Sequence, residues 1–219
     1  MERGLKISLC GCSGMGKTTI AKELSDIMGI PFISGSYSDL VPSTKSELHK
    51  DMITKNLNDI YNQDYQLLNL RRNQLKGVDT YVSDRSFIDN ASYFVYKLSH
   101  LVPECETLAF LDLCKSLLPE FTTHIIIIPY TWDMIDKWVI EDNHKRVTNR
   151  VFQMEIFSIM DTVTKILLDT LVKAWSIHIG GTENQVFQDK NTGIKVLYLN
   201  NIDREERISV IKCFLGIGL

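Results

Sequence analysis

The sequence predicts an α/β fold in three layers, in which a five-stranded parallel sheet lies between helices. Two observations predict this class. Short apolar runs typical of buried strands alternate along the 219 residues with longer segments of helical periodicity. A glycine-rich segment at 11–18 joins the first predicted strand to the first predicted helix. We expect one domain over 1–219, because no repeat, low-complexity tract or clear linker divides the chain.

The first strand and helix are expected over about residues 5–28. Apolar and polar side chains alternate at the start of this segment, as in a strand, and apolar side chains then recur at helical spacing. Gly29 is a typical helix stop. A short second strand follows at Pro31–Ser34, and the segment 35–45, rich in Ser, Gly and Pro, is predicted to be a loop.

The middle of the chain predicts three helices and one strand. The first helix covers 46–76. Its apolar side is expected to hold Leu67, Leu68, Leu70 and Leu75. A strand at Thr80–Ser83 follows, and Ser86 and Asp89 then have the spacing of a capping box for the next helix. The third helix spans about 104–118.

The last third begins with a strand at Thr123–Pro129. Its continuous isoleucine run is typical of a strand that is buried on both faces. A long amphipathic helix is predicted over 145–173. The residues expected to face inward are Phe152, Ile156, Ile159, Val163 and Ile166.

Two segments compete to be the fifth core strand, Ser176–Ile179 and Lys195–Leu199. The second is preferred, because Asn201 and Asp203 then cap a final helix. In this interpretation residues 180–194 form a polar excursion that ends in a turn.

Composition narrows the class of protein. A net charge of -3 argues against a general polyanion binder. The five cysteines form no C-x-x-C pair, which predicts a reducing, cytoplasmic setting and no zinc site. No signal peptide is recognised, and the longest apolar run, Ile125–Ile128, is far too short to cross a membrane.

Residues 11–18 match the phosphate-binding pattern G-x-x-x-x-G-K-S/T without a mismatch. In this pattern backbone N–H groups surround a polyphosphate, Lys17 reaches its outer phosphates, and the Thr18 hydroxyl binds Mg²⁺. ATP and Mg²⁺ are therefore the expected cofactors. The predicted nucleotide-binding residues are Gly11, Cys12, Ser13, Gly14, Met15, Gly16, Lys17, Thr18 and Thr19.

The rest of the chain selects among phosphate-loop proteins. It contains no N-K-x-D motif of a GTPase and no strand that ends in Asp-Glu. Asp84 closes a strand and is followed by Arg85. Because ligands of open α/β sheets bind at the carboxyl ends of strands, Asp84 is expected beside Lys17, holding Mg²⁺ with Thr18 or orienting an acceptor. Arg85 would pair with a phosphate; a local ion pair or helix cap is the alternative.

Two further groups of side chains that contain arginines are predicted to bind phosphate or substrate. Arg146 and Arg150 share one helix face in a proposed lid at about 131–150 and could neutralise charge during phosphoryl transfer; a solvated helix face is the alternative. On the helix before the third strand, Gln66, Arg71 and Arg72 could read a base edge and hold a monophosphate. An ordinary polar helix face explains that second group equally well.

These features resemble the P-loop kinases of nucleosides and nucleotides, a group that includes thymidylate-kinase-like, deoxynucleoside-kinase-like and ribosylnicotinamide-kinase-like enzymes, many encoded by bacteriophages. The resemblance lies in 11–18, in Asp84-Arg85-Ser86 with Asp89, and in the order strand, charged lid and long helix after residue 123. It implies a five-stranded parallel sheet, ATP and Mg²⁺ as co-substrates, and a closing lid. Asp84 and Arg85 would be the acidic–Arg pair near the acceptor, and Arg146 and Arg150 the lid arginines.

The chain departs from this group in one respect that concerns the acceptor. Nucleoside kinases of the group usually place a carboxylate base directly after the second strand, whereas here the first acid is Asp39. A sugar hydroxyl needs such a base, but a monophosphate needs arginines instead. The sequence therefore favours a nucleoside monophosphate, with a deoxynucleotide preferred, and makes Asp39, Gln66, Arg71, Arg72 and Arg85 the candidate substrate-binding residues.

Two alternatives stay open. The first is a kinase of a hydroxyl acceptor, which could be a nucleoside, nicotinamide riboside or a hydroxyl in DNA; the acidic net charge disfavours DNA. The second is a nucleotide-binding switch or ATPase that has no small-molecule acceptor. An aromatic-rich helix at 88–99 also leaves a homodimer open.

Overall fold

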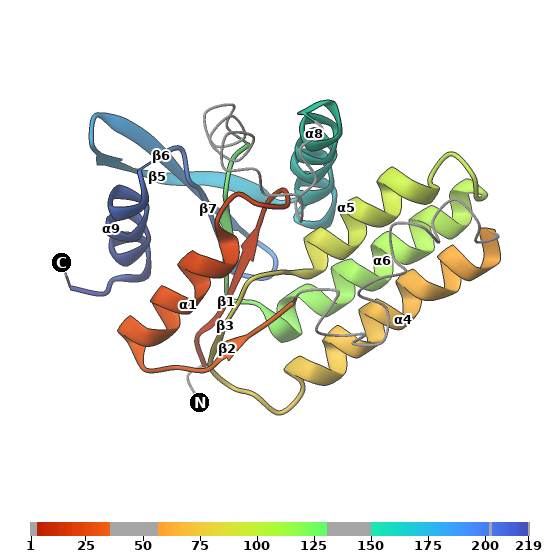
Figure 1. Ribbon diagram of the computed structural model, residues 1–219, viewed down its shortest axis with the longest axis horizontal. Helices are drawn as coiled ribbons and strands as arrows, with labels where there is room; N and C mark the ends of the chain where they lie inside the picture. The colour runs from red at the N-terminus through yellow and green to blue at the C-terminus, as the bar shows by residue number, and fades with distance from the viewer. Residues whose placement is uncertain (1–3, 36–56, 131–149, 202, 219) are drawn as a thin grey trace, which may run out of the picture.

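The computed structural model describes residues 4–35, 57–130, 150–201 and 203–218. A mixed sheet of seven strands forms the middle layer, in the order β2-β3-β1-β4-β7-β6-β5 (Figure 1). The strands are β1 (Lys6–Cys10), β2 (Phe32–Ile33), β3 (Tyr81–Ser83), β4 (His124–Ile127), β5 (Leu171–Ile179), β6 (Thr182–Asp189) and β7 (Lys195–Tyr198). The pairs from β2 to β7 are parallel, whereas β6 is antiparallel to both β7 and β5.

The predicted parallel core is confirmed, but the prediction of five strands for the whole sheet is wrong. The hairpin β5–β6 adds two antiparallel strands to the free edge of β7. The segment 180–194, predicted to be a polar excursion, therefore contains a strand. Its inward positions include Asn184 and Asp189, both buried, so the polar composition concealed the alternation of a strand.

The preference for Lys195–Leu199 as the fifth core strand is confirmed by β7, which pairs in parallel with β4. Asp203 caps the following helix as predicted, because its Oδ1 accepts hydrogen bonds from the backbone N–H groups of Glu205 and Glu206. The competing segment Ser176–Ile179 is also a strand, but it lies in β5 at the edge of the sheet.

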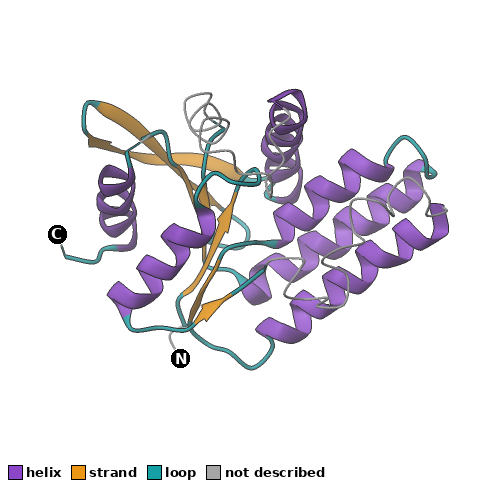
Figure 2. Cartoon of the chain, in the orientation of Figure 1, coloured by secondary structure: helices purple, strands orange, loops and turns teal. Residues whose placement is uncertain are grey.

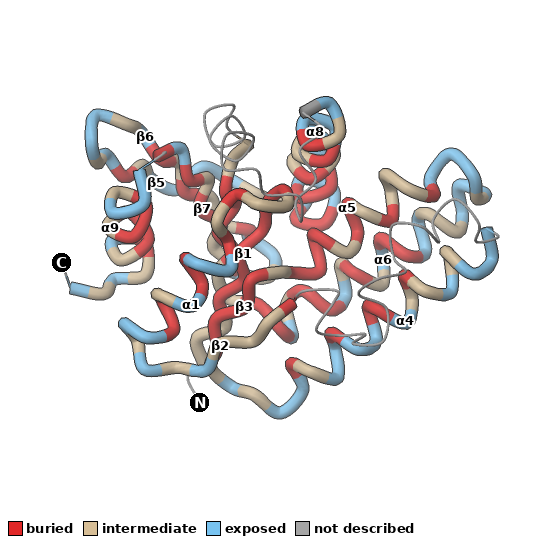
Figure 3. The backbone as a smooth tube through the Cα atoms, viewed as in Figure 1, coloured by how far each residue is buried: buried red, intermediate tan, exposed pale blue. Residues whose placement is uncertain are grey.

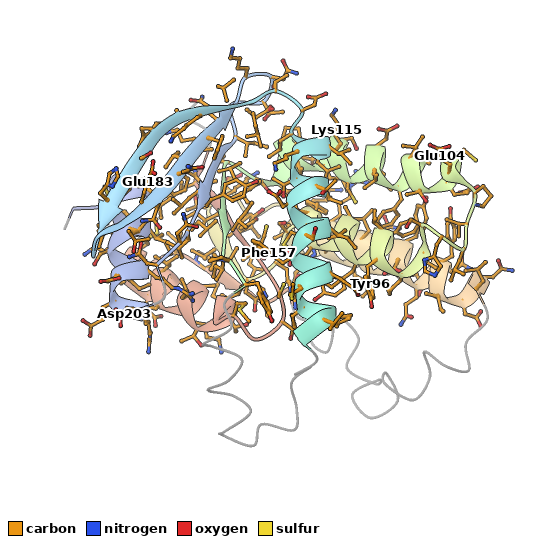
Figure 4. The ribbon with its side chains drawn as sticks, turned by 90° about the horizontal axis from the view of Figure 1, so that it is seen from above. Tyr96, Glu104, Lys115, Phe157, Glu183 and Asp203 are labelled. Carbon is orange, nitrogen blue, oxygen red and sulfur yellow. The ribbon has the colours of Figure 1, made fainter. Side chains whose placement is uncertain are left out.

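Helices cover both faces of the sheet. α1 (Lys17–Met28) and α9 (Arg204–Leu215) lie on one side, and α4 (Leu57–Leu75), α5 (Phe87–Leu98), α6 (Glu104–Phe121) and α8 (Arg150–Leu167) lie on the other (Figures 1 and 2). Seen from above, α8 lies between the hairpin and the pair α5–α6 (Figure 4). Tyr96 of α5 is labelled on one side of α8, and Phe157 of α8 itself is labelled on the other. This arrangement is the predicted three-layer sandwich.

The long helix predicted over 145–173 ends earlier than expected, at Leu167. Three residues later the Thr170 hydroxyl donates to Asp189 Oδ1 at 2.7 Å and ties the start of β5 to the end of β6. The same carboxylate accepts the backbone N–H of Thr192 at 2.9 Å, which closes the turn into β7. Residues 171–173, predicted to be helical, instead pair with β6 as the first residues of β5.

The core follows the sheet and the inner sides of the helices (Figure 3). The isoleucine run Ile125–Ile128 is buried as predicted. Between α5 and α6 the Phe94 ring stacks on Phe110 with centroids 4.0 Å apart. Two predicted core positions are wrong: Leu70 is 39% exposed and Ile166 is 47% exposed, because each lies on the outer side of its helix.

Among the helices that the structure describes, none has both the length and the apolar composition that a membrane span requires.

Replacing Phe94 by alanine tests the core. The fully buried ring packs on Phe110 and on the edge of Tyr65, so Phe94→Ala is expected to lower the free energy of unfolding by about 3–5 kcal/mol in urea denaturation. Leu108→Ala on the half-exposed face of α6 is the control and should cost less than about 1 kcal/mol. Equal losses would contradict the assigned core.

Candidate active site

The phosphate loop lies between the end of β1 and the start of α1. Gly11, Gly14 and Gly16 have φ of 148°, 83° and 84°, a region in which a side chain is strained. A Cβ on Gly11 would also lie 2.7 Å from the carbonyl oxygen of Ile128. Gly16 is the N-cap of α1 and supplies no side chain to the helix end. The backbone N–H groups at this positive helix end are therefore available to an anion.

Lys17 is folded back onto its own loop. Its ammonium group donates hydrogen bonds to the carbonyl oxygens of Gly11 at 2.7 Å and Cys12 at 2.5 Å, and the residue is only 5% exposed. Burial, aided by the charge of Arg85, lowers the pKa of Lys17 to about 7. The carboxylates of Asp89 and Asp84 favour the charged lysine but do not offset its burial.

Asp84 lies beside the phosphate loop, as the strand order predicts. Its Oδ2 accepts the Thr18 hydroxyl at 2.6 Å and its Oδ1 accepts the backbone N–H of Gly35 at 2.6 Å. The residue is 3% exposed. One carboxylate therefore joins the end of β3 to the start of α1 and to the segment after β2.

The oxygen pair of Thr18 and Asp84 fits Mg²⁺. Mg²⁺ is commonly held by one or two carboxylates with water and substrate phosphates completing the shell, so it needs no larger protein cage. Within the described ranges no group of three His, Cys, Asp or Glu side chains could hold a metal. This arrangement suits an ion that arrives with a nucleotide.

Arg85, Ser86 and Asp89 form a compact unit at the start of α5. Ser86 and Asp89 make the predicted capping box. Asp89 Oδ1 also pairs with Arg85 Nη1 at 3.0 Å, and the Arg85 guanidinium lies over the ring of Tyr93. The alternative of a local ion pair is therefore seen for Arg85, but its partner is Asp89 and not the neighbouring Asp84.

Arg71 enters this cluster from α4. Its Nη2 donates to the carbonyl oxygen of Gly35 at 2.8 Å, and the residue is 4% exposed. Its Nε and Nη1 have no hydrogen-bond partner within the described part of the chain. A Cβ on Gly35 would lie 2.4 Å from Arg85 Cβ and 2.7 Å from Arg71 Nη1. The Arg85 stem and the Arg71 guanidinium group thus leave no room for a Cβ at position 35.

The remaining predicted residues are not brought into this cluster. Gln66 and Arg72 are exposed on α4, because the helical turn directs them away from the side of Arg71. Asp39, Arg146 and the proposed lid up to residue 149 lie outside the described residues. Arg150 is the first residue of α8, and its side chain also lies outside them.

The sequence indicates no site role for Asp89 beyond capping and none for Gly35. The spacing of four residues between Arg85, just before the start of α5, and Asp89 in its first turn could have indicated the ion pair. Gly35 gave no such signal, because its role depends on Arg71, which lies 36 residues further along the chain.

The pH dependence of nucleotide binding tests the state of Lys17. Phosphates favour the charged ammonium, so a lysine with a pKa of about 7 in the free protein must take up a proton on binding. The affinity for ATP should therefore fall as the pH rises above about 7.5, with proton uptake approaching one per ATP. Calorimetry in buffers of different ionisation enthalpy measures this uptake.

Lys17→Met is the matched control for this titration. It should weaken ATP binding and remove the proton uptake, because the variant has no group left to titrate at this position. A wild-type affinity that stays constant from about pH 7.5 to about pH 9.5 would contradict a depressed pKa.

The comparisons with known proteins give the family and agree with the fold. The family model described as "AAA domain" matches residues 6–158. A structure of deoxyadenosine kinase from M. mycoides with the products dCMP and a flexible dCDP superposes with a TM-score of 0.59 and 15% identity, over 97% of this chain and 98% of that one. The same kinase with bound dCTP gives a TM-score of 0.57, 15% identity and coverage of 97% and 99%.

A third structure is the YorR protein of Bacillus subtilis in complex with phosphorylated GDP, with a TM-score of 0.52, 15% identity and coverage of 96% of this chain and 95% of that one. No curated protein matches the sequence. The family model covers well over half of the chain, and the superpositions span nearly all of it. The chain therefore belongs to the AAA domain family, and it has the fold of the P-loop nucleoside and nucleotide kinases.

Proposed function

We propose that the protein transfers the γ-phosphoryl group of ATP to a nucleoside monophosphate, with a deoxynucleotide as the favoured acceptor. The observation that carries the proposal is the pair of arginines beside Asp84: the guanidinium group of Arg71 and the Cβ and Cγ of Arg85 both lie against Gly35. Two nitrogens of the buried Arg71 have no partner among the described residues, and an anionic acceptor would satisfy them.

The donor half of the site uses the phosphate loop. When ATP binds, the ammonium group of Lys17 breaks its hydrogen bonds to the carbonyl groups of Gly11 and Cys12 and binds the outer phosphates instead. The backbone N–H groups of the loop bind the same phosphates. Mg²⁺ held by Thr18 and Asp84 would neutralise charge on the donor phosphates. Arg146 and Arg150 of the proposed lid would supply further positive charge as the phosphoryl group moves.

The acceptor half favours a phosphate over a hydroxyl for a steric reason. A carboxylate base cannot stand at position 35, because any Cβ there meets Arg85 and Arg71. Asp84 already accepts hydrogen bonds from Thr18 and Gly35, and Asp89 already holds Arg85 and the helix cap. The acceptor therefore faces guanidinium groups at the place where a hydroxyl substrate needs a base.

The base and sugar of the acceptor need contacts of their own. Asp39, Gln66 and Arg72 are retained as candidate contacts to it. Gln66 and Arg72 lie on exposed positions of α4, the same helix that carries Arg71, so a nucleotide held at Arg71 would extend along this helix.

A hydroxyl acceptor is the second candidate function. The observation that favours it is the fold shared with a deoxyadenosine kinase. In that case Asp84 or Asp39 would have to take the proton of the hydroxyl group. A switch or ATPase, the third candidate, would hydrolyse ATP without any acceptor.

Incubation with ATP labelled in its γ-phosphate, Mg²⁺ and a panel of nucleosides and nucleoside monophosphates separates these functions. We expect label in diphosphates formed from one or a few deoxynucleoside monophosphates. Label in monophosphates formed from nucleosides would overturn the phosphate acceptor. Release of inorganic phosphate with no labelled acceptor would overturn the kinase itself.

Substitution of the two arginines tests their role. Arg71→Met and Arg85→Ala should each lower kcat/KM for the acceptor by roughly a hundredfold and change the Kd for ATP less than about threefold, because they lie on the acceptor side. The matched control is Lys76→Met, which removes an exposed charge just after α4. Equal damage to ATP binding and to transfer would contradict the assignment.

A further inference from the structure

Arg207 of α9 joins two loops that are far apart in the sequence. Its Nη1 donates to the carbonyl oxygen of Met15 in the phosphate loop at 3.2 Å, across 192 residues. Its Nε donates to the carbonyl oxygen of Asn201 in the loop after β7 at 2.6 Å. The side chain is buried, with 2% of the residue exposed. Burying a charged group costs free energy unless hydrogen bonds or an ion pair compensate for the lost water.

The bond to Met15 fixes the direction of an amide in the phosphate loop. The peptide between Met15 and Gly16 is trans, so its C=O and N–H point in opposite directions. Arg207 holds the C=O from the side of α9. The N–H of Gly16 must then point away from α9, and Gly16 is the N-cap of α1, where the N–H groups face a bound anion.

The loop that holds the other end of Arg207 is itself anchored to the hairpin. The Asn201 side chain accepts a hydrogen bond from Asn184 of β6 at 2.7 Å and donates to Glu206 of α9 at 2.8 Å. Asn184 is fully buried and also accepts the backbone N–H of Asn200 at 2.7 Å. The two added strands therefore hold the loop, and the loop holds Arg207.

We propose that Arg207 is a positioning residue that sets the Met15–Gly16 peptide for phosphate binding and links the hairpin β5–β6 to the donor site. The inference rests on the proposed function, in that a nucleoside triphosphate binds at residues 11–18. Arg207 touches no reacting atom. Its effect passes through the amide of Gly16.

The first measurement is binding of ATP and of inorganic tripolyphosphate to the whole protein without acceptor, by calorimetry. Arg207→Gln should weaken the binding of both ligands by roughly tenfold, because the hydrogen bond from the charged guanidinium group to Met15 is lost. The two ligands should lose affinity equally, because only contacts to their phosphates change. Arg207→Lys keeps the charge but not the two-sided fork, so it should recover part of the loss.

The matched control is Arg204→Gln on the same helix. Arg204 is exposed and pairs with Glu23 of α1 at 2.6 Å, so this variant weakens the contact of α9 with α1 and leaves the phosphate loop alone. Its affinity for ATP should stay within about twofold of the wild type. An Arg207→Gln protein that binds ATP as the wild type does, or no more weakly than Arg204→Gln, overturns the proposal.

A second measurement does not depend on any ligand. Amide hydrogen exchange in the phosphate loop should be faster in Arg207→Lys than in Arg204→Gln, at equal thermal unfolding midpoints. If Arg207→Gln fails to fold, Arg207→Lys decides both measurements. If the wild type binds no ATP, the proposed function fails, and unchanged exchange in Arg207→Lys would separately overturn the role of Arg207.

Discussion

The carboxylate of Asp84 is the constraint on which the arrangement of this site depends. It is buried, and it accepts one hydrogen bond from Thr18 at the start of α1 and another from the backbone of Gly35 after β2. A buried carboxylate without these bonds would be costly. The parallel order β2-β3-β1 makes them available, because it brings the carboxyl ends of the three strands to one edge.

Around this carboxylate the charges are arranged in two halves. Lys17 is held by carbonyl groups of the phosphate loop on one side, and the side chains of Arg71 and Arg85 surround Gly35 on the other side. Asp89 binds Arg85 and leaves Arg71 with unused nitrogens within the described chain. The two halves meet at Asp84, and under the proposed function the donor and the acceptor would approach each other there.

The hairpin β5–β6 changes which strand forms the edge of the sheet: without it the last strand would be β7. Strand β6 pairs with β7 and thereby covers its free side, and β5 then becomes the last strand. Buried polar side chains hold the hairpin in place: Asn184 binds the loop before α9, and Asp189 binds Thr170 and Thr192. Through Arg207 this part of the fold is connected to the phosphate loop on the side of α9.

The sequence by itself determined what depends on local spacing. The phosphate loop at 11–18, the capping box of Ser86 and Asp89, and the buried strand at Ile125–Ile128 could be predicted because each is a short pattern with its own physical meaning. Tertiary structure alone decided the surroundings of Gly35, the burial of two Arg71 nitrogens without a partner among the described residues, and the strand β6. These depend on side chains that meet across the fold, where buried hydrogen bonds outweigh the local preference of polar residues for solvent.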